Sequence, residues 1–169
     1  MKMDKKNIVL VGMPSSGKST IGRALAEELG LQFIDTDQII MEKEKRPLRD
    51  IVEADGTAAF LRIQEDAVRE LNLEGYVIAT GGSVICGKTS MAHLKENGLV
   101  VYLETDFADI EKRVAPGRRF ARNREQSLFD VYREREPLYR AYADVTVECS
   151  GKTEEEVVRE IKNKMLSTT

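Results

Sequence analysis

Residues 8–20 read Ile-Val-Leu-Val-Gly-Met-Pro-Ser-Ser-Gly-Lys-Ser-Thr, and this stretch decides the fold. Its first four residues are all apolar, which is typical of a buried strand. The stretch from Gly12 to Thr20 contains the pattern G-x-x-x-x-G-K-[ST], with every fixed position matched. Glycines let the backbone N–H groups turn toward an anion, and the start of the following helix adds partial positive charge. The stretch therefore predicts a phosphate-binding loop between a strand and a helix.

Within this loop, Lys18 can reach the outer phosphates of a nucleotide as a point charge, and the hydroxyl of Ser19 can ligate Mg²⁺. The alternative is a glycine-rich turn that exposes a lysine to solvent. We expect the loop to bind ATP together with Mg²⁺. The predicted nucleotide-binding residues of the loop are Gly12, Pro14, Ser15, Ser16, Gly17, Lys18, Ser19 and Thr20.

Outward from the loop, short apolar runs alternate with segments of helical periodicity. Apolar residues recur at helical spacing at Ile21, Leu25 and Leu29, before a glycine suited to end a helix. Thr153 and Glu156 form a capping box before the last helix. This alternation predicts a three-layer α/β/α fold with a parallel sheet. The predicted strands are residues 8–11, 31–34, 76–79, 99–103 and 145–147.

Composition narrows the class of protein. The chain has 169 residues, which suit a single domain, and a net charge of −3, which argues against nucleic-acid or membrane partners. Its 2 Cys are far apart, so neither a disulfide framework nor a structural zinc site is expected, and a cytoplasmic location is natural. With 1 His, proton transfer should rely on carboxylates, and positive charge on Lys, Arg or a metal.

The remaining motifs favour a small-molecule kinase over other phosphate-loop proteins. The sequence lacks the D-x-x-G and N-K-x-D motifs of GTPase switches, and it is short for a transport ATPase. Asp35 and Asp37 follow the second predicted strand and share one face of an extended chain. One can hold Mg²⁺, and the other can accept the proton of an attacking hydroxyl. Alternatively, Asp37 caps the helix that follows.

Two further segments suit the site of such a kinase. Gly81 and Gly82 follow the third predicted strand and permit close approach of a ligand to the backbone, although a plain tight turn would look the same. Residues 116–124 contain four arginines and no acid. A lid that closes over ATP would use this charge on the transferring phosphoryl group. A solvated loop and an RNA-contacting patch are the alternatives.

Taken in order, these motifs resemble the shikimate kinases, within the nucleoside-monophosphate-kinase-like group of phosphate-loop proteins. The resemblance covers nearly the whole chain. It is carried by the phosphate loop, Asp35-Thr36-Asp37, Gly81-Gly82, Val100-Val101-Tyr102-Leu103-Glu104 and Arg135-Glu136-Pro137-Leu138-Tyr139.

The resemblance implies a five-stranded parallel sheet of order 2-3-1-4-5, an acceptor-binding region at about residues 37–65 and a lid at about 114–126. It also implies transfer of the γ-phosphate of ATP to the 3-hydroxyl of shikimate by a cytoplasmic monomer. Catalytic roles fall to Lys18, Asp37 and either Arg118 or Arg119. Asp35 joins Ser19 as a metal ligand, and Arg113 lies against the adenine. The implied acceptor-binding residues are Asp37, Arg62, Gly81, Gly82 and Arg135.

This chain departs from the family pattern at the acceptor end. Where the family has Phe-Arg followed three residues later by Glu, Leu61 stands in the Arg place and Gln64 in the Glu place. Arg62 follows one residue later, a rotation of about 100° on a helix. Ser83 replaces the third of three glycines. These changes leave two alternatives open: a kinase of another polyhydroxy acid or nucleotide, or a non-catalytic nucleotide-binding module.

Overall fold

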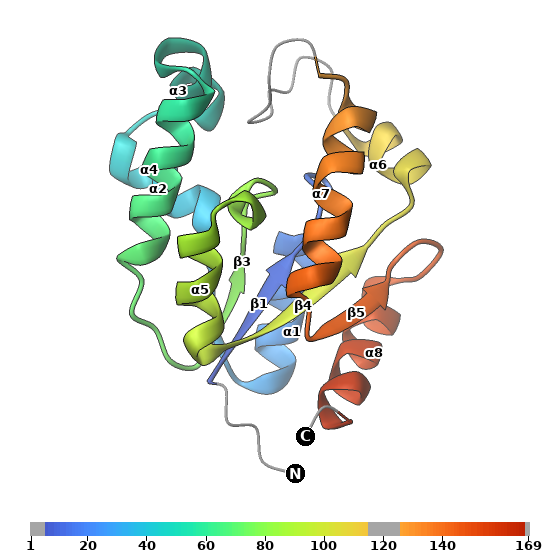
Figure 1. Cartoon of the computed structure of the whole chain (residues 1–169). Helices are drawn as coiled ribbons and strands as arrows, with labels where there is room; N and C mark the ends of the chain where they lie inside the picture. The colour runs from blue at the N-terminus through green and yellow to red at the C-terminus, as the bar shows by residue number, and fades with distance from the viewer. Residues whose placement is uncertain (1–5, 115–125, 168–169) are drawn as a thin grey trace.

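The computed structural model describes residues 6–114 and 126–167. Within them, all strand pairings are parallel and form one sheet of order β2-β3-β1-β4-β5, which confirms the predicted fold class (Figure 1). The predicted strand positions agree with the observed ones to within about one residue at each end. The strands are β1 (Asn7–Val11), β2 (Gln32–Asp35), β3 (Tyr76–Ala79), β4 (Gly98–Glu104) and β5 (Val145–Glu148).

Helices cover both faces of the sheet, which gives the three predicted layers (Figure 1). Helices α1 and α8 pack on one face, and α5, α6 and α7 pack on the other. The helical elements are α1 (Lys18–Leu29), α2 (Thr36–Glu44), α3 (Leu48–Asp55), α4 (Thr57–Arg69), the 3₁₀ turn η1 (Val84–Cys86), α5 (Lys88–Asn97), α6 (Phe107–Arg113), α7 (Leu128–Tyr142) and α8 (Glu154–Leu166).

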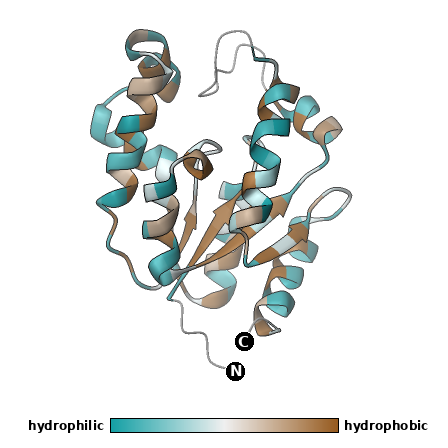
Figure 2. Cartoon of the chain, in the orientation of Figure 1, coloured by the Kyte–Doolittle hydropathy of each residue, from teal (hydrophilic) through white to brown (hydrophobic). Residues whose placement is uncertain are grey.

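The sheet separates two hydrophobic clusters, because alternate residues of each strand face opposite layers. Ile8 and Leu10 of β1 face α1 and α8, whereas Val9 and Val11 face the layer of α5 to α7. Every residue of β1 is buried, and Figure 2 shows the strands as the most hydrophobic part of the molecule. Burial on both faces explains why the strands appear in the sequence as continuous apolar runs.

Local signals at the helix ends agree with the sequence analysis. Gly30 ends α1 in the left-handed conformation (φ 69°), where a residue without a Cβ is favoured. The capping box of Thr153 and Glu156 is present at the start of α8. A second capping box, of Ser127 and Asp130, starts α7.

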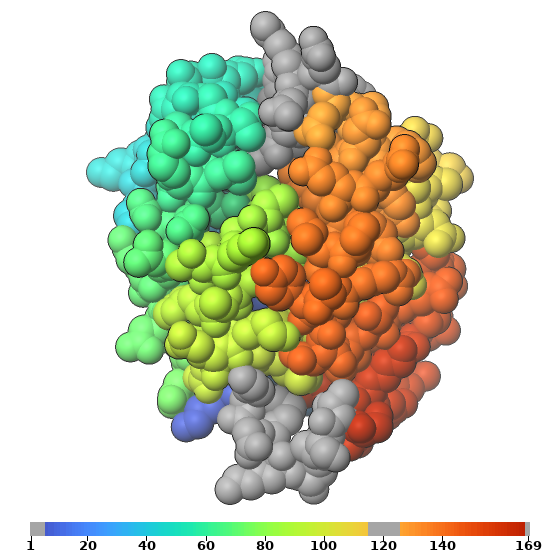
Figure 3. Space-filling view, in the orientation of Figure 1, coloured from blue at the N-terminus to red at the C-terminus, as the bar shows by residue number. Residues whose placement is uncertain are grey.

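A third, smaller hydrophobic cluster lies among α2, α3 and α4, to one side of the sheet. Its buried members are Ile40, Ile51, Phe60 and Ala67. These helices occupy most of the predicted acceptor-binding region at 37–65. In the space-filling view, α3 and α4 (teal) and α7 (orange) stand on opposite sides of the visible face, with η1 and α5 between them (Figure 3).

The predicted lid at about 114–126 lies almost entirely outside the described residues, and Arg118 and Arg119 lie outside them as well. Its arginines therefore stay a prediction from the sequence. Among the helices of the described part of the chain, none has the length and apolar character needed to cross a membrane.

Candidate active site

The phosphate loop joins the carboxyl end of β1 to the start of α1. Two of its glycines adopt conformations that exclude larger residues: Gly17 has φ 92°, and a Cβ at Gly12 would stand 2.9 Å from the carbonyl oxygen of Leu103. The loop curls over Lys18, whose Nζ donates to the carbonyl oxygens of Gly12 (2.6 Å) and Met13 (2.8 Å). The ammonium is thereby held inside the loop, at the start of a helix, where it adds to the attraction for phosphate.

Ser19 and Asp35 meet at the edge of this loop, as the sequence analysis predicted for a metal site. The Ser19 hydroxyl donates to Asp35 Oδ2 at 2.5 Å. Asp35 Oδ1 accepts from the backbone N–H of Asp37 at 2.9 Å and so caps α2. The capping residue is therefore Asp35, and the alternative in which Asp37 caps the helix is wrong. Asp37 lies in the first turn of α2.

The donor set at this edge fits Mg²⁺. Hydroxyl and carboxylate oxygens are the ligands that Mg²⁺ prefers, and it usually takes one or two carboxylates and completes its shell with water and phosphate. No cluster of three or more His, Cys, Asp or Glu side chains that could enclose a metal occurs within residues 6–114 and 126–167.

Beside the loop is a cavity of about 220 Å³. Strands β1, β2 and β3 end around it, as expected for a parallel sheet that binds ligands at its carboxyl edge. Lys18, Ser19, Asp35 and Asp37 contribute to its wall. The cavity is lined by Pro14, Ser15, Gly17, Lys18, Ser19, Thr20, Asp35, Asp37, Thr80, Gly81 and Gly82.

The paired glycines approach the acids and the loop closely. A Cβ at Gly81 would overlap the carboxylate of Asp37, and one at Gly82 would stand 2.7 Å from Pro14. The backbone N–H of Gly81 donates to Thr36 Oγ1 at 2.9 Å, which ties the end of β3 to α2. Thr36 was not among the predicted site residues. A side chain at either position would collide with Asp37 or Pro14, so the turn requires glycine.

Arg135 projects from α7 to the same place. Its side chain is 3% exposed, and its Nη1 would lie 3.2 Å from a Cβ at Gly82. Tyr139, one turn further along α7, donates its hydroxyl to the carbonyl oxygen of Gly82 at 2.7 Å. Burial raises the pKa of Tyr139 well above its usual range, so the phenol stays protonated as a donor. The helix therefore brings a buried cation to the glycine turn and holds it there.

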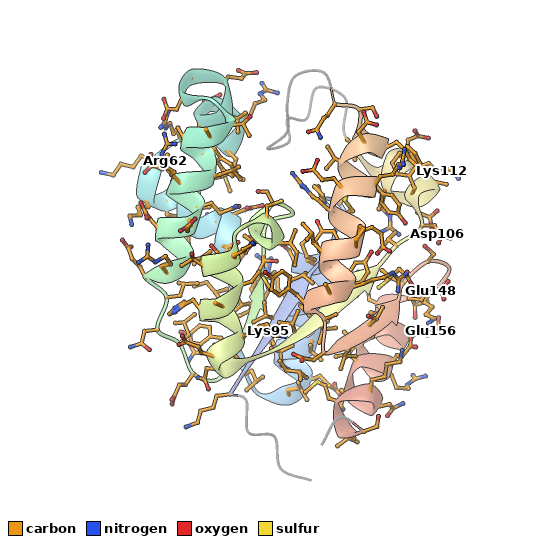
Figure 4. The ribbon with its side chains drawn as sticks, viewed as in Figure 1. Arg62, Lys95, Asp106, Lys112, Glu148 and Glu156 are labelled. Atoms are coloured by element: carbon orange, nitrogen blue, oxygen red, sulfur yellow. The ribbon has the colours of Figure 1, made fainter. Side chains whose placement is uncertain are left out.

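The replacements at the acceptor end are in contact with each other. Gln64 of α4 is 3% exposed, and its Oε1 accepts from the hydroxyl of Ser83 at 3.1 Å. Leu61 is half-buried and packs against the α2–α4 cluster. Arg62 is exposed on the side of α4 that faces away from α7 (Figure 4). The structure thus does not bring Arg62 to the other predicted acceptor-binding residues.

Arg113, predicted to lie against adenine, ends α6 at the rim of the loop. Its Nη1 lies 3.5 Å from the carbonyl oxygen of Ser15. The structure therefore places Arg113 beside the phosphate loop. All predicted site residues within the described chain except Arg62 gather around the carboxyl edge of the sheet.

Comparisons with known proteins agree with this geometry. The family model for shikimate kinase matches residues 14–166. A shikimate kinase of Haemophilus influenzae (strain PittEE) is 37% identical over 150 residues, which cover 85% of this chain and 83% of the relative. A shikimate kinase of Sulfurihydrogenibium sp. is 34% identical over 95% of this chain and 98% of its own.

Solved structures give the same result. A shikimate kinase from Acinetobacter baumannii in complex with shikimate has a TM-score of 0.88 and 32% sequence identity, and the match covers 98% of this chain and 95% of that one. The shikimate kinase of Aquifex aeolicus has a TM-score of 0.81 with 28% identity, over 95% and 96% of the two chains. A gluconokinase from Sinorhizobium meliloti, 18% identical, shares the fold alone. Sequence and fold agree, and the chain belongs to the shikimate kinase family.

Proposed function

We propose that this protein transfers the γ-phosphate of ATP to the 3-hydroxyl of shikimate. The observation that carries the proposal is the single cavity in which the phosphate loop, Asp35, Asp37 and the Gly81-Gly82 turn meet. Residues that suit a phosphate and residues that suit a hydroxylated acceptor thus lie around one space. Arg135, buried behind the turn, suits the carboxylate of the acceptor because a guanidinium pairs well with carboxylates.

The residues divide the work of the transfer. Asp37 accepts the proton of the attacking hydroxyl and orients the hydroxyl oxygen toward the γ-phosphate. Lys18 exchanges its carbonyl partners in the loop for phosphate oxygens and balances the charge that develops on them. Ser19 and Asp35 would hold Mg²⁺, which supplies charge neutralisation between the phosphates. Positioning and electrostatics provide most of the rate in such transfers.

The test is ADP release measured with a panel of acceptors in the presence of Mg²⁺. Shikimate, gluconate and a nucleoside monophosphate represent the candidate classes. We expect turnover with shikimate, and its loss when Mg²⁺ is chelated. Turnover with another acceptor but not with shikimate would contradict the proposed acceptor while leaving the kinase activity in place.

A second candidate, phosphorylation of a different hydroxy acid, is favoured by one specific observation. Leu61 stands where the family pattern has an arginine, and Arg62 is exposed on the far side of the helix. An acceptor carboxylate would then have one arginine fewer to bind, at a cost of a few kcal/mol at most. The acceptor panel decides between the two candidates directly.

We also propose that the protein acts as a monomer in the cytoplasm. The phosphate loop, Asp35, Asp37 and the glycine turn, all of one chain, already meet at the same cavity, so none of these groups has to come from a partner. Sedimentation of the protein with ATP and shikimate should give the mass of one chain. A dimer that dissociates with loss of activity would contradict this.

A further inference from the structure

Gln64 and Ser83 form a buried, neutral, hydrogen-bonded pair beside Gly81, one of the glycines that line the cavity. Gln64 projects from α4, and Ser83 follows the glycine turn after β3. They are 3% and 5% exposed, respectively, and their hydrogen bond is 3.1 Å long. Each replaces a residue of the family pattern, and the two replacements depend on each other, because a glycine at position 83 would leave the amide without its partner.

The hydrogen bond determines which end of the amide is available. The Ser83 hydroxyl donates, so the partner atom of Gln64 is the carbonyl oxygen Oε1. The amide nitrogen Nε2 makes no hydrogen bond within the described residues. Among the described side chains, the one fully enclosed polar atom without a partner is Thr105 Oγ1, so Gln64 Nε2 is not fully enclosed although its side chain is nearly buried. A buried amide with an accessible, unused donor is ready to bind a ligand oxygen.

The amide lies next to the group expected to bind the reacting hydroxyl. A Cβ at Gly81 would overlap the Asp37 carboxylate and stand 3.3 Å from Gln64 Oε1, so both side chains flank the same glycine. Asp37 as a carboxylate accepts hydrogen bonds, whereas the amide nitrogen donates them. Two adjacent oxygens of one ligand would suit this neighbouring acceptor and donor.

We infer that Gln64, held in orientation by Ser83, selects acceptors that carry a second hydroxyl next to the one that is phosphorylated. Asp37 accepts a hydrogen bond from the reacting hydroxyl. Gln64 Nε2 donates a hydrogen bond to the oxygen of the adjacent hydroxyl. Arg135 binds the carboxylate. The class of acceptor is therefore a monocarboxylate with vicinal hydroxyls. This inference rests on the proposed function, in which shikimate is such an acceptor.

The experiment compares shikimate with its 4-deoxy analogue, which lacks the neighbouring hydroxyl, in wild type and in Gln64→Met. Methionine has a similar volume but no donor. We expect wild type to favour shikimate in kcat/KM by about tenfold, the value of one well-placed neutral hydrogen bond. Gln64→Met should reduce that preference to about twofold. A change in stability alone would lower both values equally and leave their ratio unchanged.

Ser83→Ala tests the orienting role separately. It should raise the KM for shikimate severalfold and leave kcat and the KM for ATP within about twofold, because the amide remains but is free to rotate. The matched controls are Gln32→Glu, at the far end of β2, and Ser90→Ala, a buried serine of α5; both should behave as wild type. Thermal unfolding of each variant confirms that it is folded.

The outcomes separate this inference from the proposed function. If wild type phosphorylates shikimate but Gln64→Met keeps the full preference over the deoxy analogue, the inference is overturned and the proposed function stands. If wild type leaves shikimate untouched but phosphorylates gluconate, and Gln64→Met lowers its preference for gluconate over an analogue without the neighbouring hydroxyl, the proposed function fails and the inference stands. If wild type phosphorylates no acceptor with vicinal hydroxyls, both are overturned.

Discussion

At the scale of single residues, Asp37 is the group whose removal should separate phosphoryl transfer from nucleotide binding. Asp35, not Asp37, caps α2 and contacts Ser19, whereas Asp37 lines the cavity beside the glycine turn, where an acceptor would bind. Asp37→Asn should lower kcat by about 10²–10⁴-fold, the usual contribution of a general base, with the Kd for ATP nearly unchanged. Single-turnover kinetics and ATP titration measure the two effects. An equal loss of ATP binding would place Asp37 at the nucleotide instead.

Asp35 has two roles that two substitutions can separate. Asn caps helices about as well as Asp, so Asp35→Asn should keep the end of α2 intact while weakening the metal site. Asp35→Ala should remove both the N-cap and the metal ligand. Loss of the cap should lower the free energy of unfolding by about 0.5–2 kcal/mol. Chemical unfolding checks the cap, and the Mg²⁺ concentration for half-maximal activity checks the metal site. Equal Mg²⁺ requirements in wild type and Asp35→Asn would remove Asp35 from the metal.

At the scale of elements, α7 holds the guanidinium of Arg135 in place relative to the sheet. Tyr139 stacks on Tyr102 of β4, with ring centroids 5.1 Å apart, and donates to the carbonyl oxygen of Gly82. Tyr102 in turn donates to Glu136. These contacts fix the helix from which Arg135 projects. Tyr139 is therefore a positioning residue that acts through the glycine turn and Arg135.

Tyr139→Phe should lower the free energy of unfolding by about 1–2 kcal/mol, because it leaves the buried carbonyl of Gly82 without its donor. It should also raise the KM for the acceptor more than the KM for ATP. The matched control is Tyr142→Phe on the same helix, whose hydroxyl makes no hydrogen bond within the described residues. Urea unfolding and steady-state kinetics provide the measurements. An equal effect of the two substitutions would assign Tyr139 to packing alone.

The elements also show which parts of the site were predictable. A motif of adjacent residues, such as the phosphate loop, predicts its own geometry, because strand, turn and helix are local. Strand order is not local and came from the resemblance. Gln64 and Ser83 are 19 residues apart and lie on different elements. The sequence therefore shows that both residues differ from the family pattern, but it does not show that they contact each other. Arg62 shows the same limit of prediction from sequence. It lies one residue after the position where the family pattern has Arg, and on α4 this shift directs its side chain away from the site.

At the scale of the whole molecule, stability should depend on pH through its buried thiol. Cys149, after β5, is 8% exposed, and burial raises its pKa from about 9 to about 11, since the thiolate is poorly solvated. Between these values the folded protein holds a proton that the unfolded chain releases. Stability is therefore full below pH 9 and falls as the pH rises through 11, by on the order of 2 kcal/mol.

Urea unfolding at pH 8, 9, 10 and 11 measures this slope. Cys149→Ala should flatten it between pH 9 and 10, whereas above pH 10 the buried hydroxyls of Tyr102 and Tyr139, whose pKa values are also raised by burial, should continue the decline in both proteins. At pH 8, a thiol reagent should modify the exposed Cys86 quickly and Cys149 only at the rate of unfolding. Rapid modification of both thiols in the folded protein would contradict the burial on which the pH dependence rests.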